Sequence, residues 1–279
     1  MIQITATGLH VSVNGAVVYL DNWAFIELAK KDPVRRRRFL AAVHGGIDVL
    51  FSVTNAAEFS GPQGRSADAL KAFLDEIGPR WFPARLDATE VVKREIAGEH
   101  SIEACIDKRF FKSYVADQMR PPASGLGKVA PISERLFWLG AIVDRVGQQR
   151  ESISRTSAEF DKVMKEKMCT VRAKCKSDST LLNRKFPSVP FNPSLRAGFV
   201  YHNLFRVMAI EANSLKKGDG LDFCHAVIAC AYASFAALDR HWKHRLLTLP
   251  SNPLARIYSP LELNQMVIDM EAWVRHRAA

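Results

Sequence analysis

The sequence predicts an α/β fold with a parallel central sheet that is flanked by helices and carries a large helical insertion or subdomain. Two short apolar segments near the start, 16–20 and 47–53, have the pattern of strands buried on both faces, and 235–239 and 255–258 supply two more near the end. Helical segments separate these strands, which implies right-handed crossovers and a parallel sheet. Between the two groups of strands, residues 85–215 are nearly all helical in pattern.

A β-hairpin is expected at the start of the chain. Segments 9–13 and 16–20 flank Asn14-Gly15, and both turn residues tolerate the positive φ of a tight hairpin turn. Thr54 or Asn55 is expected to cap the helix after the second buried strand. The predicted helices cover 23–31, 34–43, 54–59, 66–78, 88–119, 133–176, 195–215, 221–232 and 261–276, with proline-containing irregular stretches at 121–127 and 186–193.

The composition is typical of a folded protein, since 48% of the 279 residues are hydrophobic and 24% are charged. Collagen-like, fully disordered and low-complexity classes are therefore excluded. No apolar run reaches the roughly 18 residues that a membrane-spanning helix needs. No Lys or Arg precedes Lys30, unlike the charged start of a secretory signal. We therefore expect a cytoplasmic protein with no membrane partner.

The formal net charge of +10 favours a polyanionic partner, of which nucleic acid is the commonest. The excess is concentrated, because residues 145–185 hold 11 basic and 5 acidic side chains. Further basic clusters are Arg35–Arg38 and the segment 240–245. Such clusters can contact phosphates without reading bases. The alternative is that they are solvated surfaces without a partner.

Four acidic residues are placed where a parallel sheet gathers a ligand, namely near the carboxyl ends of its strands. Asp21 and Asp239 each end a predicted strand. Glu58 lies in the helix after the second strand, and Asp222 lies near the start of the helix before the strand 235–239. Folding could bring all four into one crevice.

A cluster of carboxylates is costly, because two of them 4 Å apart repel by about 4 kcal/mol at an effective dielectric constant of 20. A hard cation such as Mg²⁺ or Mn²⁺ removes that cost and can activate water against a phosphodiester. Each acid also has a structural interpretation. Asp21 could cap a helix, Glu58 could be a surface residue, Asp222 could belong to a capping box with Asp219, and Asp239 could pair with Arg240 or Lys243.

Four segments of the chain resemble the PIN-domain nucleases. They are the apolar strand ending in Asp21, the segment Ser52-Val53-Thr54-Asn55-Ala56-Ala57-Glu58-Phe59-Ser60-Gly61, the helix opening Gly220-Leu221-Asp222-Phe223-Cys224-His225-Ala226, and the strand 235–239 followed by Trp242. The closing strand 255–258 and its helix also fit. The second segment is the most specific match, and the likeness covers about half of the chain.

The resemblance implies a divalent-metal-dependent endonuclease, usually acting on RNA, whose Mg²⁺ or Mn²⁺ is held by Asp21, Glu58, Asp222 and Asp239. It further implies a PIN-like catalytic domain made of residues 1–84 and 216–279, with 85–215 as a mainly helical insertion. Many small bacterial members are toxins neutralised by an antitoxin, so an antitoxin or other regulatory protein is a candidate partner. The chain departs from the family where Asn22 and Trp23 follow the first Asp.

Asn22, His225, Arg240 and Lys243 are the candidate substrate-binding residues. His225 follows Asp222 by three positions and therefore lies on the same helix face, although packing against the sheet is the alternative. A homo-oligomer remains open. Two other functions also remain open: a PIN-like module that binds nucleic acid or protein without cutting, and a nuclease that acts on DNA.

Overall fold

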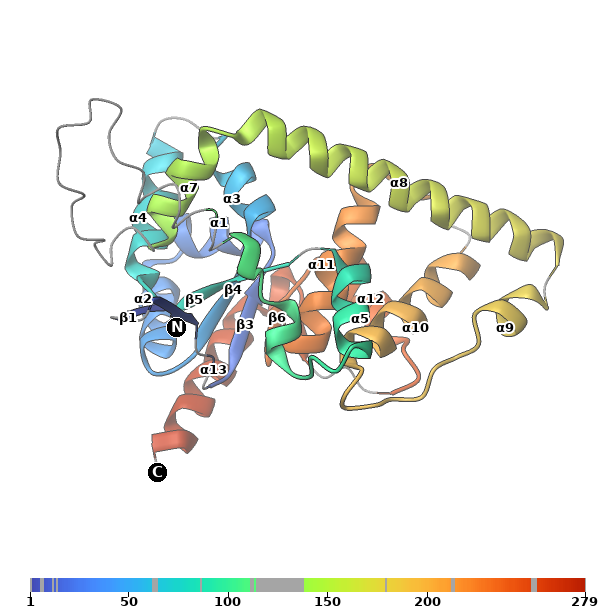
Figure 1. The fold of residues 1–279 in the computed structure, drawn as a ribbon. Helices are drawn as coiled ribbons and strands as arrows, with labels where there is room; N and C mark the ends of the chain where they lie inside the picture. Colours follow the sequence, from blue (N-terminus) through green and yellow to red (C-terminus); the bar gives the residue numbers. More distant parts are fainter. Residues whose placement is uncertain are drawn as a thin grey trace.

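The computed structural model describes residues 2–278 except 6, 7, 12, 14, 62–64, 86, 111, 112, 114–137, 179, 212, 213 and 252–254. Its centre is a parallel sheet of five strands (Figure 1). In spatial order these are β5 (Trp81–Ala84), β4 (Asp48–Ser52), β3 (Val17–Leu20), β6 (Phe235–Ala237) and β7 (Arg256–Tyr258). The predicted α/β class with a PIN-like central sheet is confirmed.

The strands pair as their apolar pattern requires. Val18 of β3 is aligned with Val49 of β4 on one side and with Phe235 of β6 on the other, so β3 lies inside the sheet and is buried on both faces. The sequence pattern did not reveal β5, which contains Pro83. A proline is tolerated there because β5 is the edge strand of the parallel sheet, and its outer side is joined, among the described residues, only by an isolated antiparallel bridge between Ala84 and Ile106.

The predicted hairpin between 9–13 and 16–20 is wrong. Instead β2 (Gly8–Val11) pairs antiparallel with β1 (Ile2–Thr5) in a separate two-stranded sheet. The physical reason is that β3 has parallel partners on both sides, which leaves no free edge for a hairpin partner.

Helices cover both faces of the sheet (Figure 1). Alternate strand residues divide between two hydrophobic clusters, so that Val18 and Leu20 belong to the first and Val17 and Tyr19 to the second. The first cluster is completed by α1 (Asn22–Lys30), α2 (Pro33–His44), α3 (Val53–Phe59), α4 (Arg65–Ile77), α7 (Leu139–Gly147) and α13 (Leu263–Ala278). The second is completed by α5 (Ala88–Ile96), η1 (Ile102–Cys105), α8 (Arg150–Ser177), α10 (Arg196–Ile210), α11 (Asp219–Tyr232) and α12 (Arg240–Leu247).

The helical middle, residues 85–215, has helices whose boundaries differ from those predicted. The predicted helix 88–119 is interrupted, because α5 is followed by Gly98 in the left-handed region at φ 95° and then by the short η1. Its end, from residue 114 onward, lies outside the described residues. The predicted continuous helix 133–176 is two helices, α7 and α8, separated by a turn at Gln148-Gln149; its start, like the predicted loop 121–127, lies outside the described residues. The irregular stretch 186–193 is confirmed, and the short α9 (Leu181–Lys185) precedes it.

The C-terminal elements agree with the prediction except for α12, which was not expected. The short η3 (Pro260–Glu262) begins the final helical region, and α13 continues it. Across the described part of the chain, none of the helices has both the length and the apolar character needed to span a bilayer.

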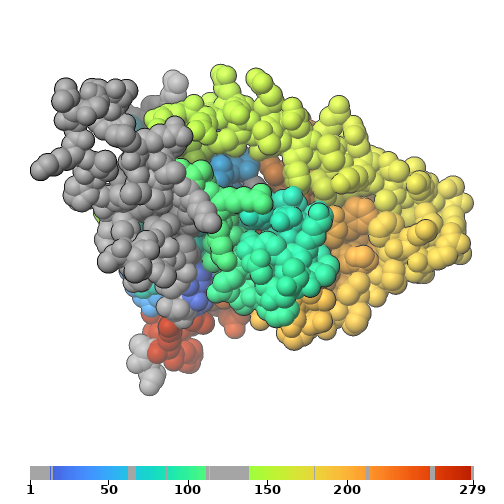
Figure 2. Space-filling view, viewed as in Figure 1, coloured from blue at the N-terminus to red at the C-terminus, as the bar shows by residue number. Residues whose placement is uncertain are grey.

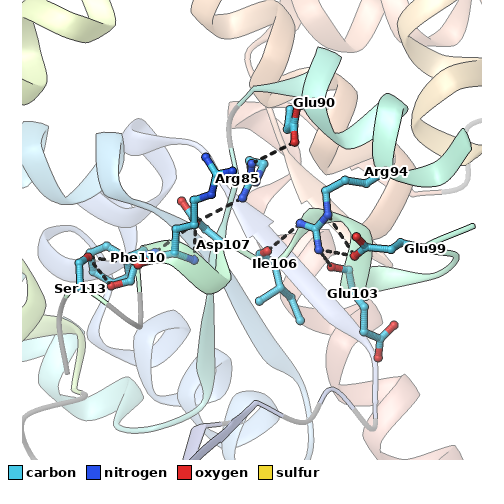
Figure 3. A network of polar contacts seen from close by, with 10 residues as sticks. Arg85, Glu90, Arg94, Glu99, Glu103, Ile106, Asp107, Phe110 and Ser113 are labelled. Atoms are coloured by element: carbon cyan, nitrogen blue, oxygen red, sulfur yellow. Dashed lines mark hydrogen bonds and ion pairs between the residues drawn. The ribbon is translucent and has the colours of Figure 1, made fainter. Parts of the chain in front are cut away.

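Two arginines join α5 to the segments before and after η1 (Figure 3). Arg94 donates to the Glu99 carboxylate and, at 3.1 Å, to the backbone carbonyl of Ile106. Arg85 forms longer ion pairs of 3.7 Å with Glu90 and with Asp107. These two cations are therefore engaged in holding the chain and are not free phosphate contacts.

Candidate functional site

The carboxyl ends of β3, β4 and β6 meet at one edge of the sheet, because the strands are parallel neighbours. Asp21 follows β3 directly, and its backbone N–H donates to the carbonyl of Ala237 at the end of β6 at 3.0 Å. Asp239 comes two residues after that carbonyl. The fold therefore places the first and last predicted acids beside each other at the expected edge.

Asp21 and Asp239 are both N-caps. The Asp21 Oδ1 accepts the N–H of Asn22 at 2.8 Å at the start of α1, and the Asp239 Oδ1 accepts the N–H of Trp242 at 2.8 Å at the start of α12. Asp239 is thus not merely a loop residue paired with Arg240 or Lys243. In each carboxylate, these bonds engage one oxygen.

Glu58 and Asp222 belong to helices and are solvent-exposed. Glu58 lies in the last turn of α3, and Asp222 lies in the first turn of α11. Asp222 is not part of a capping box, because the N-cap of α11 is Gly218. The carboxylate of Asp161 in α8 binds the start of that helix, accepting N–H groups of Gly218 at 3.0 Å and Gly220 at 2.9 Å.

The pKa values show that the predicted acids interact. Desolvation and then the charge of Asp239 raise the pKa of Asp21 to about 6, while the N–H of Asn22 opposes this rise. Desolvation and the charges of Asp21 and Asp239 raise the pKa of Asp222 to about 7. Partial desolvation and the charge of Asp21 also raise the pKa of Glu58. Folding therefore brings the four carboxylates within range of mutual repulsion.

Carboxylate oxygens are the donors that Mg²⁺ and Mn²⁺ prefer, so the chemistry of this set fits a hard divalent cation. Among the residues that the structure describes, however, no three His, Cys, Asp or Glu side chains are gathered closely enough to hold an ion. The site therefore provides the donors and their charge but not a preformed coordination shell.

Of the four acids, Glu58 and Asp222 are the exposed ones. Figure 2 shows a hollow between α8 and the segment from α5 to η1, and parts of α3 (blue) and α11 (orange) are visible inside it. These are the helices that carry Glu58 and Asp222. These two helices are therefore open to solvent on the face shown.

Asn22 belongs to a network at the edge of the sheet. Its Oδ1 accepts from Asn55 Nδ2 at 2.7 Å, and Asn55 also accepts from Ser52 Oγ at 2.6 Å. Ser52 and Asn55 form the capping box of α3, so the N-cap is Ser52 and the prediction of Thr54 or Asn55 as cap is corrected. The network ties the start of α1, beside Asp21, to the helix that carries Glu58.

His225 is buried under the acids and bonded to Tyr19. Its Nδ1 shares a hydrogen bond with the Tyr19 hydroxyl, and its Nε2 is buried without a hydrogen-bond partner among the described residues. Burial lowers the pKa of His225 to about 4, so the ring is neutral at neutral pH. Burial, and then the charges of Asp21 and Asp222, raise the pKa of Tyr19. The pair therefore forms a neutral polar layer beneath the carboxylates.

The two predicted phosphate contacts after β6 differ in their freedom. Arg240 is exposed, whereas Lys243 Nζ donates to Glu262 at 2.7 Å. The neighbouring Arg245 is buried, pairs with Glu211 at 2.7 Å and stacks on Trp242 with its guanidinium carbon 4.5 Å from the ring centre. Part of this basic cluster therefore serves the packing of α12.

Sequence reasoning did not identify Tyr19 or Asp161 as members of the site. A tyrosine in an apolar strand two residues before Asp21 was a usable signal, because a buried hydroxyl needs a partner. Asp161 had no signal, since an acid within a basic helix is normally a surface residue. Only the contact between α8 and α11 shows its position.

Comparisons with known sequences and structures assign the chain to no family. No protein-family model, no curated protein and no solved structure was found to match the chain. The positions and charges of the carboxylates are therefore the basis for a functional proposal.

Proposed function

We propose that this protein is a divalent-metal-dependent endonuclease of the PIN type that hydrolyses phosphodiester bonds, with RNA as the favoured substrate. The observation that carries the proposal is the electrostatic coupling of Asp21, Glu58, Asp222 and Asp239 at one end of a parallel sheet. Acids that raise one another's pKa values reduce stability, and such arrangements are concentrated at functional sites. These four acids also lie in the segments of the sequence that resemble PIN domains.

In this proposal the four carboxylates hold Mg²⁺ or Mn²⁺. When bound there, such a cation would supply an activated water and charge stabilisation for the leaving oxygen. Asp21 and Asp239 are oriented by the helix starts that they cap. Asn22 and Arg240 are available to contact the substrate near the first and last acids, and Lys243 can do so only by leaving Glu262. His225, neutral and buried, supports the site from below.

The substitution Asp21→Asn tests the mechanism. It keeps the cap geometry and removes the charge, so we expect cleavage of single-stranded RNA in Mg²⁺ or Mn²⁺ to fall by about 100-fold or more. Circular dichroism should show an intact fold. Asp68→Asn, a change at an exposed acid on α4, is the control and should cleave like the unmodified protein. Undiminished cleavage by Asp21→Asn rejects the mechanism.

The second candidate is a PIN-like module that binds nucleic acid or protein without cutting. It is favoured by the absence, within the described part of the chain, of three acids grouped closely enough to hold an ion. Salt-sensitive binding of nucleic acid without metal-stimulated hydrolysis supports this candidate. Parallel cleavage assays on single-stranded RNA, single-stranded DNA and duplexes decide between an RNA-directed and a DNA-directed nuclease.

A further inference from the structure

A polar pocket of about 680 Å³ lies where the end of α3 meets the turn between α7 and α8. Its lining includes Ser60, Gln148, Gln149, Arg150, Ser152 and Arg155. Ser60 is the C-cap of α3 and follows Glu58 by two residues. The pocket therefore adjoins the helix that carries Glu58. None of its lining residues is a ligand in the proposed metal site.

Two arginines contribute positive charge to this pocket. Arg150 and Arg155 are exposed and have no acidic partner among the described residues, while Glu151 is the acid in the lining. The pocket also lies at the start of α8, a helix of 28 residues whose first N–H groups add positive potential. The guanidinium fork of arginine matches phosphate oxygens in a bidentate manner.

Gly61 explains how Arg150 is positioned. A Cβ atom built on Gly61 would lie 2.4 Å from Arg150 Nη2 and 2.7 Å from its guanidinium carbon. The guanidinium therefore rests on the backbone just after α3, at a place that only glycine leaves open. This is the glycine of the segment that most resembles PIN domains, and the metal site itself does not require it.

We propose that this pocket is a phosphate subsite for the polynucleotide, with Arg150 and Arg155 binding a terminal or internal phosphate group. The inference rests on the proposed function in that it takes a nucleic-acid chain as the ligand. It deepens that function, because the carboxylates repel phosphate and a cationic contact beside them offsets the repulsion. A strand held here lies beside the end of the helix that carries Glu58.

Binding is measured by fluorescence anisotropy on the Asp21→Asn variant in metal-free buffer, with labelled single-stranded RNA as the probe. Adding Arg150→Ala and Arg155→Ala should weaken binding about tenfold. The slope of log K against log salt should become shallower by about 1.4, as two lost phosphate contacts require. Lys174→Ala with Lys176→Ala removes two charges from the other end of α8 and should change binding much less. Equal losses in both double variants overturn the subsite.

A charge-neutral substitution gives a second test. Gly61→Ala displaces the flexible end of Arg150 without removing its charge, so affinity should fall, by less than in Arg150→Ala, while the melting temperature stays unchanged. Gly198→Ala is the matched control, because its nearest contacts begin at 3.7 Å, and it should bind like the parent. Full affinity in Gly61→Ala contradicts the assigned position of Arg150.

Probes with a 5′-phosphate, a 3′-phosphate or hydroxyl ends identify which phosphate is bound. A preference for one phosphorylated end that disappears in the double arginine variant assigns a terminal phosphate, and an equal loss for all probes assigns an internal one. No loss with any probe overturns the proposal. These measurements need neither metal nor cleavage. They therefore test the phosphate subsite even if the protein does not cleave RNA.

Discussion

At the scale of single residues, Asp21 and Asp239 combine two tasks. Each caps a helix with one carboxylate oxygen, and each contributes negative charge to the edge of the sheet. The cap orients the side chain, since a hydrogen bond to the first turn restricts its rotamers. The structural interpretation of these two acids and the functional one are therefore compatible.

Asp222→Asn should stabilise the metal-free protein at pH 8. The pKa of Asp222 is raised to about 7, so the carboxyl contributes stability that is complete below its unfolded pKa near 4 and lost as the pH rises through 7. We expect the melting temperature in EDTA to rise by about 2 °C at pH 8, a small change because solvent screens this exposed side chain. Below pH 4, where the carboxyl is protonated in both the folded and the unfolded state, the difference should vanish.

Metal addition completes this test by differential scanning fluorimetry. Mg²⁺ or Mn²⁺ at pH 8 should raise the melting temperature of the unmodified protein and of the Asp68→Asn control, but hardly that of Asp222→Asn, since a ligand of the folded state stabilises it by mass action. A lower melting temperature for Asp222→Asn in EDTA at pH 8 would show that the carboxylate is stabilised rather than repelled.

At the scale of elements, α8 fixes the start of α11. Buried Asp161 accepts backbone N–H groups of that helix, and Gly220 permits the close approach, because a Cβ there would lie 2.8 Å from the carbonyl oxygen of Asp161. Asp222 is one turn away. The helical middle therefore positions a residue of the proposed metal site.

Asp161→Ala should destabilise the protein by about 2 kcal/mol, because it leaves buried N–H groups of α11 without acceptors. Urea unfolding measures this change. Metal-stimulated cleavage should also fall, while Asp161→Asn, which keeps an acceptor oxygen, should recover part of both. Glu159→Ala, at an exposed acid of the same helix, is the control. Equal stability of Asp161→Ala and the control contradicts the capping role.

Prediction of the elements from sequence succeeded where one physical signal dominates. The strand at β3 followed from an apolar run, and the irregular stretch 186–193 followed from its three prolines. The hairpin failed because Asn14-Gly15 describes a local turn preference, whereas parallel pairing of β3 with β4 and β6 is a non-local outcome. The short strand β5 was missed because Pro83 conceals its pattern.

At the scale of the whole molecule, the helices between residues 85 and 215 are not packed apart from the sheet. Phe199 of α10 and Val91 of α5 share one hydrophobic cluster with Tyr19 and Leu50 of the sheet, while Ile142 of α7 belongs to the cluster on the opposite face. The two faces of one sheet are therefore covered by helices from both parts of the sequence.

We therefore expect a single cooperative unfolding transition. A hydrophobic cluster shared by the sheet and the helical middle unfolds as one unit, so the calorimetric and van't Hoff enthalpies should agree, with a ratio of about 1. Near-UV and far-UV circular dichroism should give the same midpoint. Two resolved transitions, one of them confined to residues 85–215 by hydrogen exchange, would instead identify a separate subdomain.

The sequence by itself determined the α/β class, the buried strands and the identity of four acids at strand and helix ends, because burial pattern and residue type are local properties. Only the tertiary structure decided that Asp161 holds α11, that Tyr19 and His225 pair beneath the carboxylates, and that Arg150 rests on Gly61. These contacts join residues far apart in the chain, and their formation depends on how helices pack across a sheet, which no local pattern specifies.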